Sequence, residues 1–271
     1  MSDSLSALTA AIDRADSATD LTDAVQALAD ACLVEAVPTL VEALSYNNPG
    51  AAVAAVDGLI TLGEPAVAGL LEQLDLNNYT ARSWAIRALA GIGDPRGLVT
   101  LLGAATADIS MSVRRAAARG LGAMKWHWFP SNLLEIAQAE ALDSLLFVAQ
   151  SDEEWVVRYA AVVGLESLSM ALPNTQAGWR QQIQVQLADQ IARDESWAVR
   201  ARSLQAQQYL REEVPLKQEV VLQEQPHSPS YAADWEQILD KLYKRKVVER
   251  SVLSEGDPAK YRQLLSTVSL G

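Results

Sequence analysis

Residues 79–93 read YTARSWAIRALAGIG, and a run of this kind, small residues around a central arginine, decides the fold because it recurs along the chain. The related runs are MSVRRAAARGLG at 111–122, EWVVRYAAVVGL at 154–165, SWAVRARSL at 196–204 and, without the arginine, NPGAAVAAVDGL at 48–59. Aligned on Arg82, Arg114, Arg158 and Arg200, the spacings are 32, 44 and 42 residues, and Ala52 lies 30 residues before Arg82. Periods of this length are typical of stacked helical hairpins, so the sequence predicts an all-α solenoid.

The composition of the 271 residues excludes several classes of protein. The 34 acidic and 22 basic residues give a net charge of −12, which would repel nucleic acid, so no nucleic-acid partner is expected. The single cysteine, Cys32, and two distant histidines exclude an internal disulfide and a zinc ligand set, so no metal site is expected. No apolar run is long enough to span a membrane and no basic leader opens the chain. We therefore expect a cytoplasmic protein.

The periodicity divides the chain into three parts. Residues 1–211 are expected to form the solenoid, with about the first 45 residues as an N-terminal cap. Residues 212–233 contain three prolines and little apolar periodicity, which predicts a linker. Residues 234–271 are expected to form a short helical appendage with an apolar stripe that fits docking on the solenoid or on a partner protein. The stripe consists of Trp235, Ile238, Leu239 and Leu242.

Glycine and proline mark the turns of the regular repeats. Gly63 is followed by Pro65, and Gly93 by Pro95. Glycine suits the left-handed residue that ends a helix, and proline suits the first turn of the next helix. We expect each Gly-x-Pro to be the tip of a hairpin.

The repeat helices have two distinct faces. At about 100° per residue, the positions one, two, five and nine residues after the repeat arginine share one face, and the positions three, four and seven residues after it lie on another. The second face is apolar, as packing requires, whereas the first is expected to line a groove. The notable groove residues are Asp57, Trp84, Arg87, Arg115, Arg119, Tyr159 and Arg202. The aligned arginines are expected to tie adjacent repeats together.

This set of groove residues suits a planar, anionic, conjugated ligand or an acidic patch of a partner. A guanidinium grips a carboxylate with two parallel hydrogen bonds and also lies against a π-system. The alternative is that the groove arginines point into solvent or tie repeats together, as arginines often do in helical arrays.

An insertion of the sequence KWHWFPSN at 125–132 lengthens one repeat and also has two interpretations. A loop carrying His127 and Trp126 would close over a ligand, with the histidine moving a proton near neutral pH. Alternatively, the aromatic side chains of the insertion seal a break between two halves of the solenoid. Cys32 is expected to be a core thiol, and His227 lies in the linker without supporting neighbours.

The runs NNPGAAVAAVDGL at 47–59, ARSWAIRALAGIGDPR at 81–96 and SVRRAAARGLG at 112–122 together resemble the phycobilisome lyase proteins with HEAT-like repeats, in particular the F-type subunits of heterodimeric phycocyanobilin lyases. The resemblance covers roughly residues 20–211 and implies a HEAT-like or armadillo-type superhelix. It further implies a cyanobacterial-type protein that pairs with an E-type subunit. Such a pair binds phycocyanobilin as its substrate, with no permanently bound cofactor, and attaches it, reversibly in some members, to a cysteine of the phycocyanin α subunit.

The resemblance also gives roles to the groove residues. Arginines would hold the bilin propionates, aromatic side chains would pack on its rings, and an acid or a histidine would handle protonation. In that order, these are Arg87, Arg115 and Arg119; Trp84 and Tyr159; and Asp57 or His127, while Trp126 of the insertion would also contact the bilin.

Two other functions are considered beside the lyase. The lyase-isomerases of a sister branch are expected to carry an Asn-His-Cys type motif at the insertion, but this chain has His127 between two tryptophans, so coupled isomerisation is not expected. The competing class is a non-catalytic HEAT-repeat scaffold or chaperone for phycobiliproteins or for phycobilisome degradation.

Overall fold

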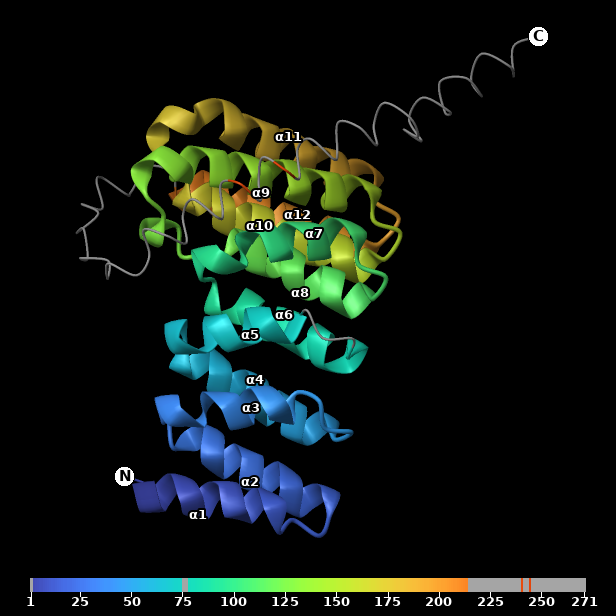
Figure 1. Cartoon of the computed structure of the whole chain (residues 1–271). Helices are drawn as coiled ribbons and strands as arrows, with labels where there is room; N and C mark the ends of the chain where they lie inside the picture. The colour runs from blue at the N-terminus through green and yellow to red at the C-terminus, as the bar shows by residue number, and fades with distance from the viewer. Residues whose placement is uncertain (1, 75–77, 214–239, 241–243, 245–271) are drawn as a thin grey trace. The chain divides into compact units, whose positions relative to one another are not determined.

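The computed structural model describes residues 2–74, 78–213, 240 and 244, and within these ranges it contains helices and no strand. Most helices come in antiparallel pairs that stack from α1 to α12 (Figure 1). The α-helices are α1 Ser2–Asp13, α2 Ala18–Asp30, α3 Val37–Ala43, α4 Pro49–Leu62, α5 Val67–Leu74, α6 Tyr79–Ile92, α7 Leu98–Ala107, α8 Met111–Gly122, α9 Ser131–Ser151, α10 Trp155–Ala171, α11 Ala177–Arg193 and α12 Trp197–Glu213. Five short 3₁₀ turns, η1 to η5, connect them.

The helices form two layers. The even-numbered helices from α2 to α12 pack each against the next, and they include all the arginine runs. The odd-numbered helices lie beside them, and α5, α7, α9 and α11 each pack mainly on the even-numbered helix that follows. The predicted all-α solenoid is therefore confirmed. In the described part of the chain, no helix is long and apolar enough to cross a membrane.

The turns between the regular repeats contain the expected glycines. Gly63 (φ 72°) and Gly93 (φ 68°) end α4 and α6 with the positive φ that glycine tolerates best. Pro65 and Pro95 then lie in η2 (Glu64–Ala66) and η3 (Pro95–Gly97), each a single 3₁₀ turn. Because α5 pairs with α6 and α7 with α8, these turns join one hairpin to the next. The prediction that they are hairpin tips was wrong.

The predicted apolar face is buried at the centre of the stack. Seven residues after the repeat arginine, or after Ala52, the equivalent leucines of α4, α6, α8 and α10 are fully buried. They are Leu59, Leu89, Leu121 and Leu165. The positions three residues after the arginine are small and buried in every repeat, which allows neighbouring helices to approach closely. Each hairpin thus buries its apolar face only against its neighbours.

Ion pairs link consecutive repeats. Arg114 of α8 donates from Nε to Asp152, just before α10, at 2.7 Å, and Arg158 of α10 donates likewise to Asp194, just before α12, at 2.8 Å. Arg82 makes the equivalent pair with Asp108. The arginines of α6, α8 and α10 therefore tie adjacent repeats together, as expected from the sequence. Arg200 of α12 does not, because its Nε donates to the Ile191 carbonyl of α11, the helix with which α12 pairs.

The aspartates of these pairs also hold the turns that precede the next helices. Asp108, Asp152 and Asp194 each accept the backbone N–H two residues later at 2.8–2.9 Å. Burial alone would raise the pKa of Asp194, but hydrogen bonds from Arg158 and from the Ser196 backbone outweigh it and hold that pKa below its ordinary value. The hydrogen bond to Asp194 raises the pKa of Arg158. Both groups therefore stay charged although they are largely buried.

The insertion coincides with a close crossing of α8 and α10. A Cβ atom on Gly122 would lie 2.1 Å from the carbonyl oxygen of Gly164, so only glycine allows the two backbones to approach this closely. Next to the crossing, Trp126 is buried, stacks on Phe129 at 5.3 Å between ring centroids, and donates from Nε1 to the Gly122 carbonyl. These contacts fit the interpretation of the insertion as an aromatic plug.

Two predictions outside the repeats have different outcomes. Cys32 is not a core thiol, because it follows α2 with a positive φ of 50° and its side chain is exposed. Most of the expected linker at 212–233 and appendage at 234–271 lies outside the described residues. The exceptions are residues 212 and 213, which end α12, and two residues of the appendage, Asp240 and Lys244. The chain separates into two units, 1–225 and 226–271, and in the second unit Lys244 pairs with Asp240.

Candidate functional site: an arginine-lined groove

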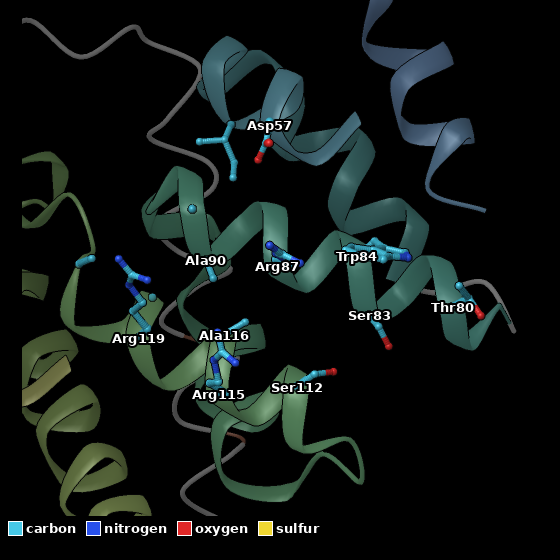
Figure 2. Close-up of a pocket in the computed structure, with 14 residues that line it drawn as sticks. Asp57, Thr80, Ser83, Trp84, Arg87, Ala90, Ser112, Arg115, Ala116 and Arg119 are labelled. Atoms are coloured by element: carbon cyan, nitrogen blue, oxygen red, sulfur yellow. The ribbon is translucent and has the colours of Figure 1, made fainter. Parts of the chain in front are cut away.

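A groove of about 690 Å³ runs over α4, α6 and α8 (Figure 2). Its 14 lining residues occupy equivalent positions of the three helices, mainly one, two, five, eight and nine residues after the repeat arginine. It brings together Asp57, Trp84, Arg87, Arg115 and Arg119, which the sequence placed on one face. The groove forms because the lining positions are mostly open to solvent, whereas the positions three, four and seven residues after the repeat arginine are buried in the stack.

The groove arginines have no hydrogen-bonding or ion-pairing partner among the described residues. Arg87, Arg115 and Arg119 are exposed, and in the described part of the chain none of them forms a hydrogen bond or an ion pair. Arg115 and Arg119 are one turn apart on α8, and Arg87 lies on α6. Three guanidinium groups that form no ion pair, in a groove with a single carboxylate, favour the binding of an anion with more than one carboxylate.

An aromatic side chain lies beside these charges. The guanidinium carbon of Arg87 is 5.4 Å from the centroid of the Trp84 ring, within cation–π range. Trp84 is half-buried, packing with one part against the hydrophobic core while another part lines the groove. The ring is therefore held in place and offers a flat apolar surface next to a positive charge.

The remaining polar lining comes from short side chains and one acid. Asp57 of α4 is exposed and is the single carboxylate among the lining residues. Ser112 and Thr80 lie two residues before the repeat arginines of α8 and α6, and Ser83 lies between Thr80 and Arg87. A carboxylate accepts hydrogen bonds from N–H donors, and hydroxyl groups donate or accept. The groove thus presents an acceptor for N–H groups as well as cations for acids.

Four predicted residues do not line this groove. Tyr159 lies on the equivalent face of α10 but outside the groove, and Trp126 is buried in the plug. His127 is exposed on η4 (Trp126–Trp128), where its ring lies edge-on to Trp128 at 6.1 Å. Arg202 donates two hydrogen bonds to Glu166 of α10, at 2.8 and 2.9 Å, and is therefore neutralised. None of these four residues therefore belongs to the group of side chains around Arg87.

The sequence reasoning missed some residues that matter for the site. The aspartates that hold the repeat arginines lie six residues before the next repeat arginine, as in Asp108 and Arg114 or Asp152 and Arg158. This spacing was a usable signal. Glu166 carried no comparable signal, because its pairing with Arg202 depends on how α12 lies against α10. Among the described residues, no group of three His, Cys, Asp or Glu side chains is arranged to hold a metal ion.

Comparison with known proteins gives the same repeat architecture and a set of close relatives. Residues 67–166 match the family model of HEAT repeats. The chain is 57% identical over 278 residues to "Phycocyanobilin lyase subunit beta" of Pseudanabaena tenuis, covering 99% of each chain. It is 51% identical over 162 residues to "Phycocyanin alpha phycocyanobilin lyase CpcF" of Synechocystis sp., covering 60% of this chain and 75% of the relative.

A solved structure is similar as well. The chain matches, with 47% identity and a TM-score of 0.59, a chain in the structure of "the complex of CpcE and CpcF of phycocyanin lyase from Nostoc sp. PCC7120". The match covers 65% of this chain and 99% of the solved one. It is also 48% identical over 203 residues to the "Phycobilisome maturation protein" of Synechococcus elongatus, covering 75% of this chain and 96% of the relative.

Proposed function

Because the chain belongs to the family of phycocyanobilin lyase beta subunits, we propose that it acts with an E-type subunit to attach phycocyanobilin to the phycocyanin α subunit. Family membership over 99% of the chain favours this function over a non-catalytic scaffold. The observation that carries the proposal at the level of residues is the groove with three unpaired arginines, one fixed tryptophan and one acid.

The groove matches the functional groups of a bilin one by one. A bilin carries two propionates, a conjugated π-system and pyrrole N–H groups. Arg87, Arg115 and Arg119 hold the propionates, each charge-assisted hydrogen bond contributing about 1.5–3 kcal/mol. The Trp84 ring packs against the pyrrole rings, and the Asp57 carboxylate accepts hydrogen bonds from pyrrole N–H groups. The volume of about 690 Å³ is in the range typical of small-molecule sites.

The chemical step joins the bilin to a thiol of the acceptor protein. The thiol of the acceptor cysteine adds across the ethylidene double bond. Its S–H bond and the C=C π-bond break, a C–S bond forms at the ethylidene carbon and a C–H bond forms at a carbon of the conjugated system, so nothing leaves. Asp57, which lies in the groove, fits a proton-handling role better than His127, which does not line it. The rate gain comes mainly from holding a reactive tetrapyrrole in one orientation and away from water. Of the two residues expected to pack on the rings, Trp84 lines the groove and Tyr159 does not, and Trp126 is buried in the plug.

Co-expression tests the proposed function. The chain would be produced with an E-type subunit, a bilin-producing pathway and the apo phycocyanin α subunit, and covalent chromophore on the α subunit would be detected by zinc fluorescence in a denaturing gel. We expect attachment that depends on both lyase subunits. A colourless α subunit in the presence of both subunits and free bilin would contradict the proposal.

A further inference from the structure

Large apolar side chains are exposed at the tips of two consecutive hairpins. At the tip that joins α7 to α8, Ile109 is 89% exposed and Met111 is 49% exposed. At the tip that joins α9 to α10, Phe147 is 54% exposed and Trp155 is 46% exposed. Both tips lie on the same edge of the stack (Figure 1). Isolated exposed apolar residues are ordinary, but four on neighbouring tips are typical of a surface that binds another molecule. We refer to these four residues as the tip patch.

A notch of about 290 Å³ lies between the two tips. Small side chains of residues 105–107 line it on the α7 side, and Phe147 of the tip patch lines it on the α9 side. Arg114, which also lines the notch, donates to both carboxylate oxygens of Asp152 and to the backbone carbonyls of Asp108 and Ile109. The guanidinium is thus satisfied within the chain. An apolar side chain of a partner is therefore a better occupant of the notch than an anion.

The surroundings of the tip patch carry an excess of negative charge. The aspartates of the two tips are neutralised by the repeat arginines, but Glu153 and Glu154 form no side-chain hydrogen bond or ion pair in the described part of the chain. Glu153 is exposed and lines the notch. The hydrogen bond to Asp152 raises the pKa of Arg114, and the charges of both glutamates raise that pKa further. A partner with lysine or arginine side chains beside its apolar ones complements this surface.

The tip patch continues along α8 into the arginine-lined groove. Met111 lies one turn before Arg115, and the residue after Met111, Ser112, lines the groove. On α10, Trp155 lies likewise one turn before Tyr159, on the face equivalent to the groove. A protein that binds to the tip patch is therefore held at one end of the groove, next to the expected bilin.

We propose that the tip patch is the docking surface for the protein that carries the acceptor cysteine, which places an apolar side chain in the notch and cationic side chains beside Glu153 and Glu154. This inference rests on the proposed lyase function and assigns the surface that receives its second substrate. A surface of four side chains suits a substrate protein that binds briefly and leaves after the reaction.

Charge opposes two other occupants of the tip patch. A bilin is itself an acid, so the glutamates beside the patch repel it, whereas the groove arginines attract it. A symmetric dimer of this chain would bring the same carboxylates of two copies together. The basic groove and the acidic tips thus select different substrates, an anionic tetrapyrrole and a cationic protein surface.

The main test measures transfer kinetics with the full-length chain, an E-type subunit, phycocyanobilin and increasing concentrations of the apo acceptor protein. Glu153→Lys should raise the KM for the acceptor protein about tenfold and leave kcat within about twofold, because docking precedes bond formation. Added salt should raise the KM of the wild-type lyase more than that of the variant. The matched control is Glu35→Lys in η1 (Val34–Ala36), which reverses an exposed acid far from α8 in sequence and should leave the KM within about twofold.

The apolar side chains give a second arm. Ile109→Ser should raise the KM for the acceptor protein about fivefold, because it removes apolar surface from the contact. Since Ile109 is 89% exposed, the urea midpoint should not change, which separates docking from folding. Val34→Ser changes an exposed valine of η1 (53%) and is the control.

Oxidative footprinting tests the occupant directly, because exposed methionine and tryptophan side chains react readily with hydroxyl radicals. Met111 and Trp155 should be oxidised in the isolated chain and in the heterodimer, and the apo acceptor protein should protect both. Protection that is already present in the isolated chain, that rises with its concentration, or that appears with the E-type subunit alone would assign the patch to the chain itself, to a second copy or to the heterodimer. Each of these results would overturn the proposal.

The kinetic outcomes separate this inference from the proposed function. Wild-type KM values for both Glu153→Lys and Ile109→Ser, with an active wild-type lyase, would overturn the docking surface and leave the lyase function intact. A raised Kd for free phycocyanobilin in these variants, measured by absorbance titration, would place the patch in the bilin site instead. No attachment by the wild-type chain with its E-type subunit would contradict the proposed function and this inference with it.

Discussion

Two sets of arginines on the same helices have opposite environments. Arg82, Arg114 and Arg158 are bound to aspartates at the start of the next repeat, whereas Arg87, Arg115 and Arg119 form no hydrogen bond or ion pair in the described part of the chain. On α8, Arg114 and Arg115 are adjacent in sequence, and about 100° of rotation separates a structural ion pair from a free guanidinium. The position on the helix, and not the residue type, decides whether an arginine is held in a structural ion pair or remains available to a ligand.

Removal of a structural arginine should have the largest effect on folding. Arg158→Ala leaves Asp194, whose side chain is 4% exposed, as a buried charge without its partner. We expect the free energy of unfolding to fall by about 3 kcal/mol, as measured by urea denaturation. Arg158→Lys keeps the charge but loses the two-bond geometry, so its free energy of unfolding should lie between those of the wild-type chain and Arg158→Ala. A loss below about 0.5 kcal/mol would place Arg158 with the groove arginines.

A fall in pH should weaken the ion pairs of the structural arginines, whereas the groove arginines have no ion pair to lose in the described part of the chain. The pKa of Asp194 is held below its ordinary value of 3.8 in the folded chain. The contribution of a carboxyl group with a depressed pKa is complete above its unfolded pKa, and it is lost progressively as the pH falls from about 4 through the folded pKa. Asp194→Asn should therefore flatten the decline of stability in this range. An equally steep decline in the variant would assign acid unfolding to other groups.

The groove arginines should matter for bilin transfer and hardly for folding. Arg87→Ala, Arg115→Ala and Arg119→Ala should each lower the rate of bilin transfer about tenfold, since each removes a charge-assisted hydrogen bond to a propionate. The free energy of unfolding should change by less than about 0.5 kcal/mol. Arg193→Ala is the control, because this arginine is 80% exposed and lies on α11, away from the groove. An unchanged transfer rate in all three variants would show that the groove arginines do not bind the propionates.

Replacement of the groove tryptophan should have a smaller effect. Trp84→Phe keeps an aromatic ring against the core but offers a weaker surface to Arg87 and to a bilin. Because exposed cation–π contacts contribute about 0.5–1 kcal/mol, transfer should fall two- to fivefold. Equal rates for Trp84→Phe and the wild-type chain would show that the ring serves packing alone.

The smallest effect is expected at the insertion. His127→Gln should leave bilin transfer within about twofold at every pH from 6 to 8, because His127 lies outside the groove and its ring lies edge-on to Trp128. A pH-dependent loss of transfer would return the proton-handling role from Asp57 to His127.

The fold was predictable because each repeat carries its own pattern. Leu89 and Leu121 recur seven residues after the arginine, and Gly63 and Gly93 occur where the chain needs a positive φ. These constraints are local in sequence, and the helical repeat of 3.6 residues fixes which of the residues share a buried face. The pairing of the helices into hairpins was not predictable from the same turns, because it depends on which neighbouring helix buries more surface.

The sequence by itself determined that Asp57, Trp84, Arg87, Arg115 and Arg119 lie on one face, since a helix fixes the direction of each side chain from its position. Only the tertiary structure decided which members of that face remain free. Arg202 is neutralised by Glu166 and Tyr159 lies beyond the groove, and the same packing buries Trp126 of the insertion in the plug. Helix geometry is local, but the partner of a charge is set by the packing of a neighbouring helix 36 residues away in sequence.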